Sequence, residues 1–153
     1  MSEQQAADQN PVFNIQKLYV KDASLEVPNA PQIFLEEGEN EIGIQLHNEA
    51  QQIGEGFFEV VLTVTVTNKI GEKTVFLAEV AQAGIFHILN IPDDDMPGVI
   101  GIHCPTILFP YVREVISDLT NRAGFSPVIL QPVNFEALFV QRMQELAEAQ
   151  GNA

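Results

Sequence analysis

Few side chains in this sequence are reactive, and their spacing does not support catalysis. His103 and Cys104 are adjacent, but sequence neighbours rarely face each other as base and nucleophile, and no third orienting group is evident. His47 and His87 lie far apart, whereas a chelating pair needs a spacing such as i, i+2 on a strand or i, i+4 on a helix. The sequence therefore predicts no catalytic residue, no metal site and no cofactor, so we expect a protein that is not an enzyme.

Carboxylates are the other abundant chemical group. Twenty-one Asp and Glu residues stand against seven Lys and Arg, which gives a net charge of −14. Nucleic acid and anionic membrane surfaces are disfavoured as partners, because binding phosphate needs a basic patch. The same charge favours basic partners. The run Asp93–Asp95 is typical of the acidic start of a helix.

Length and composition predict one soluble domain. A chain of 153 residues with a single cysteine is long enough for one core and forms no intrachain disulfide. The polar first ten residues are not a secretory signal, and we expect them to be a disordered tail. No stretch approaches the roughly 20 apolar residues of a membrane span, so we expect no membrane insertion and a cytoplasmic location. The expected organisation is a tail at 1–10, one domain at 11–149 and a frayed end at 150–153.

Alternating apolar residues predict four strands in the first part of the chain. They are Val12–Val27, a strand around Ile42–Leu46, Phe57–Thr67 and Thr74–Phe86. A proline-bounded crossover, Pro28–Pro31, follows the first strand. The other strands are separated by a loop at 51–56 and a turn at 68–73. Short links of this kind predict an antiparallel meander with one crossover.

Side-chain parity places acidic residues on strand faces. Asp22, Ser24 and Glu26 alternate along the first strand and project from one face, and Leu77 and Glu79 share a face of the fourth strand. Parity alone leaves open whether the two sets share a face of the sheet.

Two helices are expected in the second part of the chain. Pro105 and Pro110 interrupt the first, whose long piece should run from Phe109 to Arg122. The second should begin near Asn134. Four strands and two helices make an α+β domain, and two helices are too few to cover all the apolar surface. We therefore expect the chain to assemble with itself.

Four segments resemble one known family. They are YVKDASLEVPNAP at 19–31, VFLAEV at 75–80, CPTILFPYVRE at 104–114 and PVNFEALF at 132–139. The sequence resembles SecB, the family of bacterial protein-export chaperones, from Phe13 to Phe139. The resemblance implies a four-stranded antiparallel sheet with helices on one face, assembled as a dimer-of-dimers tetramer. It also implies a holdase that binds unfolded precursor proteins in the cytosol and delivers them to the SecA ATPase.

The resemblance also implies two sets of site residues. The positions that dock SecA in the family fall on Asp22, Glu26, Leu77 and Glu79. The client groove falls on Phe34, Ile42, Ile44, Leu46 and Phe139, and the family's inner sheet face falls on Phe76, Ala78, Val80 and Gln82. This chain lacks the Trp that family members often carry in the crossover, and its C-terminus is short. Both departures predict differences from the family, in the aromatic part of the groove and in any second SecA contact through the tail.

Two other functions are compatible with these residues. One is a SecB-like chaperone that serves a toxin–antitoxin system. The other is a small-molecule-binding or enzymatic α+β domain that uses Cys104, which a reactive thiol near neutral pH would support.

Overall fold

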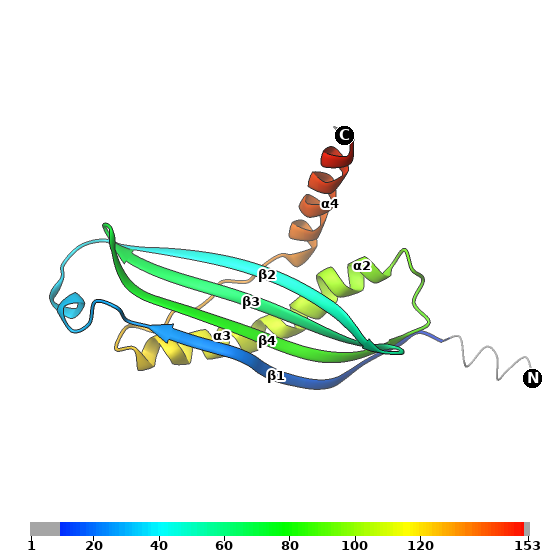
Figure 1. The fold of residues 1–153 in the computed structure, drawn as a ribbon, viewed down its shortest axis with the longest axis horizontal. Helices are drawn as coiled ribbons and strands as arrows, with labels where there is room; N and C mark the ends of the chain where they lie inside the picture. Colours follow the sequence, from blue (N-terminus) through cyan, green and yellow to red (C-terminus); the bar gives the residue numbers. More distant parts are fainter. Residues whose placement is uncertain (1–9, 152–153) are drawn as a thin grey trace, which may run out of the picture.

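A computed structural model describes residues 10–151 as one curved antiparallel sheet with helices on one side (Figure 1). The expected disordered tail lies outside the described residues except for its last residue. Residues 152–153, in the expected frayed end, lie outside them too.

The sheet contains four strands in the order β1-β4-β3-β2. They are β1 (Val12–Glu26), β2 (Asn40–Gly54), β3 (Phe57–Ile70) and β4 (Lys73–Leu89). All neighbours are antiparallel, and β2, β3 and β4 form a meander. The crossover after β1 carries the chain past two strands, so β1 and β2 are the two edges. The predicted α+β class and meander with a crossover are confirmed.

The strands are longer than the alternation predicted, because their turns are tight. The segment predicted as a loop at 51–56 is mostly strand, and only Glu55 and Gly56 separate β2 from β3. Gly71 and Glu72 separate β3 from β4 in the same way. Gly56 has φ +77° and Gly71 φ +61°, a backbone region that glycine adopts without steric cost and that tight turns commonly use.

The first helical region is joined from three pieces, as expected of a broken helix. They are α2 (Met96–Gly98), the π-helical segment η2 (Val99–His103) and α3 (Cys104–Arg122). The break was predicted at the prolines, and that position is wrong. Pro105 lies in the first turn of α3, where its missing N–H costs nothing, and Pro110 is accommodated inside the helix. The change of helix type falls at η2 instead.

Two further helical elements complete the fold. The short 3-10 helix η1 (Gln32–Leu35) lies in the crossover, and α4 (Phe135–Gly151) ends the described chain. Figure 1 shows α4 projecting from the body of the molecule. The second predicted helix is thus confirmed, and Asn134 caps it: its Oδ1 accepts a hydrogen bond from the Ala137 N–H at 2.9 Å.

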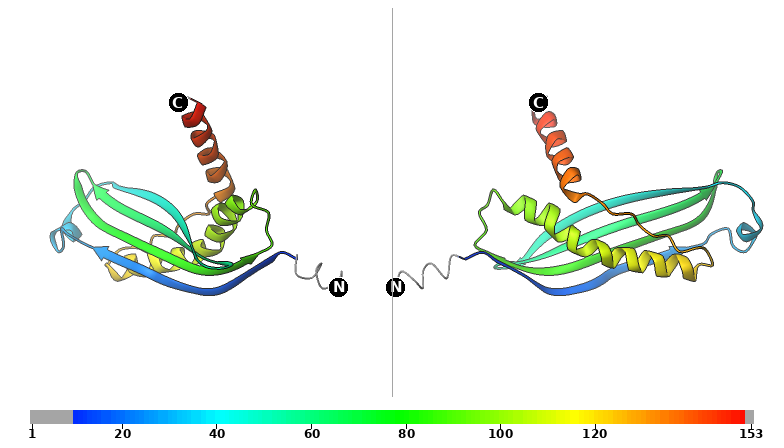
Figure 2. Two further views of the ribbon diagram at one scale, coloured as in Figure 1. Left: turned by 45° about the vertical axis from the view of Figure 1, so that its right-hand side comes forward. Right: turned by 180° about the vertical axis from the view of Figure 1, so that it is seen from behind.

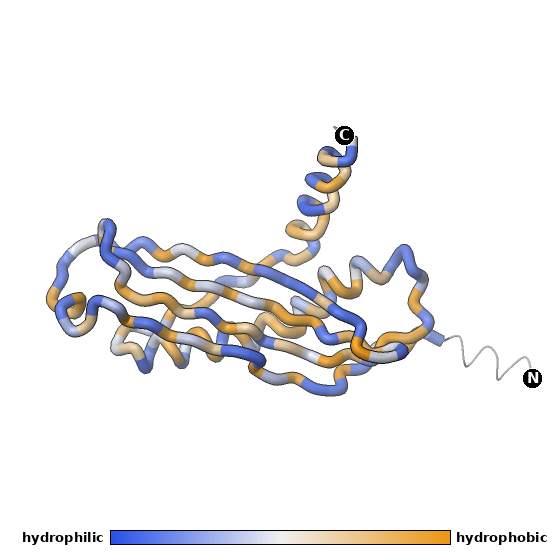
Figure 3. Tube along the Cα trace, viewed as in Figure 1, coloured by the Kyte–Doolittle hydropathy of each residue, from blue (hydrophilic) through white to orange (hydrophobic). Residues whose placement is uncertain are grey.

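The core lies between one sheet face and α3, which crosses the back of the sheet (Figure 2). Every second residue of β3 from Val60 to Val66 is fully buried there, and the hydropathy colouring of the strands alternates accordingly (Figure 3). The α3 side chains Leu108, Val112 and Ile116 are also fully buried. The buried residues of the sheet's helix side include Val60, Leu62, Val64, Val66, Asn68, Phe76, Ala78, Val80, Gln82, Phe86 and Ile88.

The helical stretch Met96–Arg122 is long and apolar enough to cross a membrane by length and composition. The expectation that no stretch is long and apolar enough for this is therefore wrong by that criterion. In the structure, Cys104, Leu108, Val112 and Ile116 of this stretch belong to the buried core cluster shared with the sheet. Packing on the sheet therefore accounts for part of its apolar character.

Candidate functional site

The strand register places the four predicted docking residues on one face of the sheet. Ser24 of β1 pairs with Glu79 of β4, and Glu26 pairs with Leu77. Directly opposed residues on neighbouring strands share a face. Asp22 has the parity of Ser24 and Glu26, so the two sets of residues meet. The structure answers the question that side-chain parity left open.

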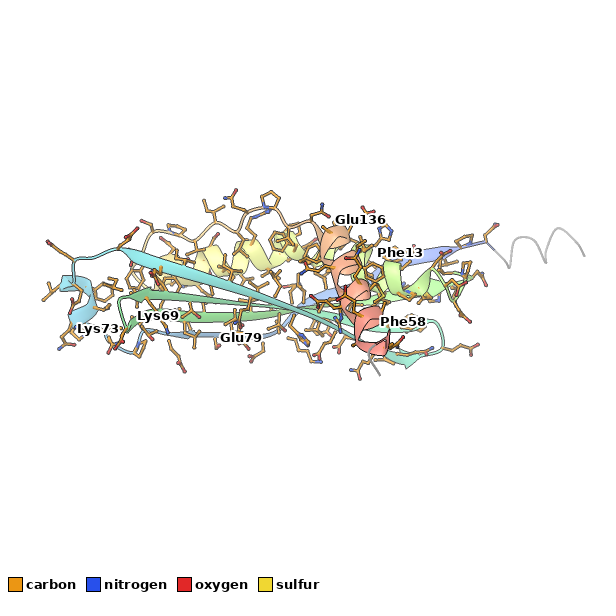
Figure 4. All side chains as sticks on the ribbon, turned by 90° about the horizontal axis from the view of Figure 1, so that it is seen from above. Phe13, Phe58, Lys69, Lys73, Glu79 and Glu136 are labelled. Atoms are coloured by element: carbon orange, nitrogen blue, oxygen red, sulfur yellow. The ribbon has the colours of Figure 1, made fainter. Side chains whose placement is uncertain are left out.

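This face, which we call the acidic face, points away from α3. Figure 4 shows Glu79 on the side of the sheet opposite the helix. Asp22 and Glu26 are exposed, and Leu77 and Glu79 are half-buried. The Thr65 hydroxyl of β3 donates to Glu79 Oε2 at 3.0 Å, which orients that carboxylate. Carboxylates around an apolar side chain suit a partner that combines basic and apolar groups.

A buried carboxylate lies further along the acidic face, where β3 pairs with Ile85 of β4. Glu59 of β3 is 7% exposed and accepts hydrogen bonds from three donors. The donors are the Tyr19 hydroxyl, Lys21 Nζ at 2.9 Å and Gln51 Nε2 at 3.0 Å. A cavity of about 300 Å³ opens beside it, lined in part by Lys21 and Gln51.

The hydrogen bonds of this cluster shift two pKa values. The bond from Tyr19, followed by that from Lys21, holds the pKa of Glu59 below 4.5 despite its burial. Burial, reinforced by the Glu59 carboxylate, raises the pKa of Tyr19 to about 12. Sequence reasoning missed this cluster. The available signal was a Glu among the β-branched residues of β3, the strand with the most regular alternation.

Three predicted client-binding residues line the edge strand β2 on the opposite side of the sheet. Ile44 pairs with Val66 and Leu46 with Val64, so both lie on the helix side. Ile42 and Ile44 remain 50% and 46% exposed, because β2 has no further strand beside it. An open cavity of about 470 Å³ at this edge is lined mostly from the other face of the sheet, by residues that include Gly43, Thr67 and Lys69. We call Ile42, Ile44 and Leu46 the β2 apolar strip.

Leu46 and Phe139 line a second cavity, of about 210 Å³, where α4 meets the sheet. Gly101 of η2 permits this contact, because a Cβ at that position would lie 2.7 Å from the Phe139 ring. Asn48 continues the alternation of the β2 apolar strip and lines the same cavity. Its Nδ2 donates to the Ile100 carbonyl at 3.2 Å, while its buried Oδ1 has no hydrogen-bond partner in the structure.

Gly101 and Asn48 were not predicted from the sequence, although both left a signal. Asn48 follows Ile42, Ile44 and Leu46 at the strand period of two. Gly101 stands inside an apolar helical pattern, which commonly marks a close approach.

Phe34 lies apart from Leu46 and Phe139, in an aromatic cluster. Its ring stacks on Phe125 with centroids 5.2 Å apart, and Phe125 contacts Phe76 at 5.4 Å. Phe34 is nevertheless 50% exposed. Phe34 and Phe125 therefore form an aromatic surface over the buried Phe76, at a crossover that contains no Trp.

The residues first considered for catalysis are not brought together. Cys104 is fully buried, and this burial raises its thiol pKa to about 12, so the thiolate is scarce near neutral pH. His103 is exposed. His47 lies 3.6 Å from Glu49, and the His87 ring stacks on Phe57.

The structure is thus an α+β domain whose sheet carries an acidic face on one side and an exposed apolar edge strand on the other. A family model described as preprotein translocase subunit SecB matches residues 6–146. The chain therefore belongs to the SecB family, a family of chaperones rather than enzymes.

Individual relatives agree with the family model. The chain is 61% identical over 153 residues to a protein-export protein SecB of Chromobacterium violaceum, with 100% of both chains covered. It is 54% identical over 142 residues to that of Neisseria meningitidis serogroup C, covering 92% of this chain and 95% of the relative. The resemblance inferred from the sequence is thus confirmed.

A solved structure supports the fold independently. A Mycobacterium tuberculosis SecB-like chaperone, in complex with a peptide from an antitoxin, superposes with a TM-score of 0.66 at 18% identity. The match covers 86% of this chain and 95% of that one.

Proposed function

We propose that this chain is a cytoplasmic holdase that binds unfolded precursor proteins and delivers them to SecA. The observation that carries the proposal is the separation of two surfaces on one sheet. The acidic face holds Asp22, Glu26, Leu77 and Glu79, and the opposite side carries the β2 apolar strip. A chaperone that must hold a client while it docks on a motor needs two such surfaces.

The client surface consists of the β2 apolar strip, Phe139 and Phe34. Exposed apolar side chains accept many sequences, and the free edge of β2 offers main-chain hydrogen bonds to an extended client. Folded proteins rarely expose such segments, so selectivity for the unfolded state requires no sequence code. The net charge of −14 adds attraction for basic client stretches.

Binding at one such surface should be weak. Burying about 1,000 Å² of apolar area contributes roughly 25 kcal/mol. Ordering about 15 client residues costs roughly 15–30 kcal/mol, so the two contributions largely cancel. Several surfaces on one assembly, engaged by one long client, restore affinity through effective concentration.

The assembly proposed here is a homotetramer, a dimer of dimers. Exposed apolar side chains along the other edge strand support self-association: Phe13, Ile15 and Val20 of β1 are each at least 36% exposed. An apolar cavity of about 400 Å³ lies beside them, lined in part by Phe13 and Ile107 of α3. A second copy of the chain would cover this edge and leave β2 free.

The acidic face is the proposed SecA dock. The support is the resemblance of its four positions to those that dock SecA in the family, and the arrangement of two exposed carboxylates, Asp22 and Glu26, with the half-buried Leu77 and Glu79. A basic module would bind there through charge-assisted hydrogen bonds. The alternative, service to a toxin–antitoxin system, has only a fold likeness in its favour, and a toxin gene beside this gene would support it.

Substitutions in the β2 apolar strip test the proposed client surface. Ile44→Ser combined with Leu46→Ser should reduce the suppression of precursor aggregation, because about 0.8 kcal/mol is lost for each methylene withdrawn from contact. Gln45→Ser, on the other face of the same strand, is the matched control and should retain full suppression. Unchanged suppression by the double variant would contradict the proposed surface, and so would loss of the tetramer, which would make these residues core.

A further inference from the structure

Strand β1 contains an extra residue at two points of its pairing with β4. Between Val20 and Asp22 the chain advances by two residues while β4 advances by one, so Lys21 is the extra residue of a β-bulge. A first bulge lies between Ile15 and Lys17. Because side chains alternate along a strand, each extra residue moves everything after it to the other face of the sheet.

The bulge at Lys21 decides where the docking residues point. Val20 pairs with Gln82, which lies on the helix side of the sheet, whereas Asp22 pairs with Ala81 on the acidic face. With regular alternation from Val20 onward, Asp22 and Glu26 would face the helix side. The dock therefore exists only because β1 is irregular at this one residue.

Side chains from two other strands hold the bulge. Lys21 Nζ donates to Glu59 Oε1 at 2.9 Å, although Glu59 belongs to β3 and β4 lies between the two strands. The crossing is possible because β4 presents the small residue Ala83 on this face, where it is fully buried. The Tyr19 hydroxyl also reaches across β4 and donates a hydrogen bond to Glu59 Oε2. The side chain of Lys21 is 47% exposed and that of Glu59 10%, so a buried carboxylate anchors a surface lysine.

We infer that Lys21 and Glu59 are positioning residues for the acidic dock: their ion pair across β4 holds the bulge that turns Asp22 and Glu26 toward Leu77 and Glu79. This inference rests on the proposed function, because it concerns SecA docking at these four positions. It adds that docking depends on two residues that need not touch the partner.

The charge of Lys21 makes the inference testable. If Lys21 acted only through its field, Lys21→Met would remove a positive charge beside the carboxylates and strengthen binding of a basic partner. If Lys21 positions the dock, the same change weakens binding. The two explanations predict opposite signs.

The experiment is a titration of the full-length chain with purified SecA. We expect Lys21→Met to bind about tenfold more weakly, which corresponds to a loss of about 1.4 kcal/mol. Lys21→Arg, which keeps the donor, should restore most of the affinity. Lys17→Met is the matched control on the same strand. It removes an identical charge outside the second bulge and should bind SecA as tightly as the parent chain or more so.

Two further measurements keep the outcome clear. Hydrogen exchange of residues 22–26 should accelerate in Lys21→Met while client binding is unchanged. If Lys21→Met does not fold, Glu59→Gln replaces it, with the same expected loss of SecA affinity.

Glu26→Lys separates failure of the inference from failure of the proposed dock. If Glu26→Lys weakens SecA binding while Lys21→Met binds equally or more tightly, the positioning role is overturned and the dock stands. If Glu59→Gln is used instead of Lys21→Met, unchanged SecA binding by Glu59→Gln likewise overturns the positioning role and leaves the dock standing. If Glu26→Lys has no effect, the proposed dock is wrong and the inference falls with it.

Discussion

At the scale of single residues, Glu59 links three strands of the sheet. It accepts hydrogen bonds from Tyr19 and Lys21 of β1 and from Gln51 of β2 while belonging to β3. A buried carboxylate is stable only when it is fully hydrogen-bonded, and these donors meet that condition. Because they also lower its pKa, Glu59 remains ionised where an isolated buried carboxyl would take up a proton.

Glu59 should contribute stability that depends on pH. Its folded-state pKa lies below the ordinary 4.5, so its contribution is complete above that pH and is lost as pH falls through the folded-state pKa. We expect Glu59→Gln to lower the free energy of unfolding by about 1–3 kcal/mol near neutral pH, and by less in acid. Urea titrations across pH, at one protein concentration, measure this difference.

The matched control for Glu59 is Glu49→Gln. Glu49 lies on the same face, but its side chain is 62% exposed. Its substitution should change stability by no more than about 0.5 kcal/mol at any pH. A Glu59→Gln difference that stayed constant or grew as the pH fell would contradict the assigned role of this carboxylate.

At the scale of elements, α4 is held to the body by a small contact. Phe135 at its start is buried, and most of the rest of the helix is exposed. Phe139 approaches the backbone at Gly101, within the π-helical segment η2. Both residues line the cavity that Leu46 shares with α4. Few buried contacts give an element low local stability, so α4 is the part of the client surface most able to move.

Gly101→Ala should loosen α4, because the new Cβ would meet the Phe139 ring at 2.7 Å. Faster hydrogen exchange of the α4 amides is the expected result. Gly98→Ala is the matched control three residues earlier, where a Cβ meets nothing within 4 Å. Alanine there should be neutral or stabilising by up to about 1 kcal/mol. Equal exchange rates in the two variants would show that Gly101 does not position Phe139.

The strands and helices whose residues follow a local pattern were predictable from the sequence. Alternation identified the four strands, and the Asn134 cap identified α4. Pattern could not locate the bulge at Lys21, because the extra residue is defined only by pairing with β4. For the same reason, parity could not show that Glu26 and Glu79 share a face. The contact between Gly101 and Phe139 joins residues far apart in sequence, so the local signal at Gly101 could not identify Phe139 as its partner.

At the scale of the whole molecule, the two surfaces must remain accessible after assembly. The acidic face and the β2 apolar strip lie on opposite sides of the sheet, so one partner cannot cover both. The exposed apolar residues of β1 lie at the other edge. Self-association through β1 would bury that edge and leave β2 open to clients. The central claim of the proposed function is that the β1 edge serves assembly while the β2 edge binds clients.

Light scattering of the purified chain, with and without an unfolded precursor, tests that claim most directly. We expect a particle of four 16.9 kDa chains that gains the mass of the unfolded precursor and gains nothing from its folded form. Because the precursor is the same protein in both states, only the exposure of its apolar segments differs. A tetramer that captured neither form would show that assembly closes the β2 edge, and would contradict the proposed function.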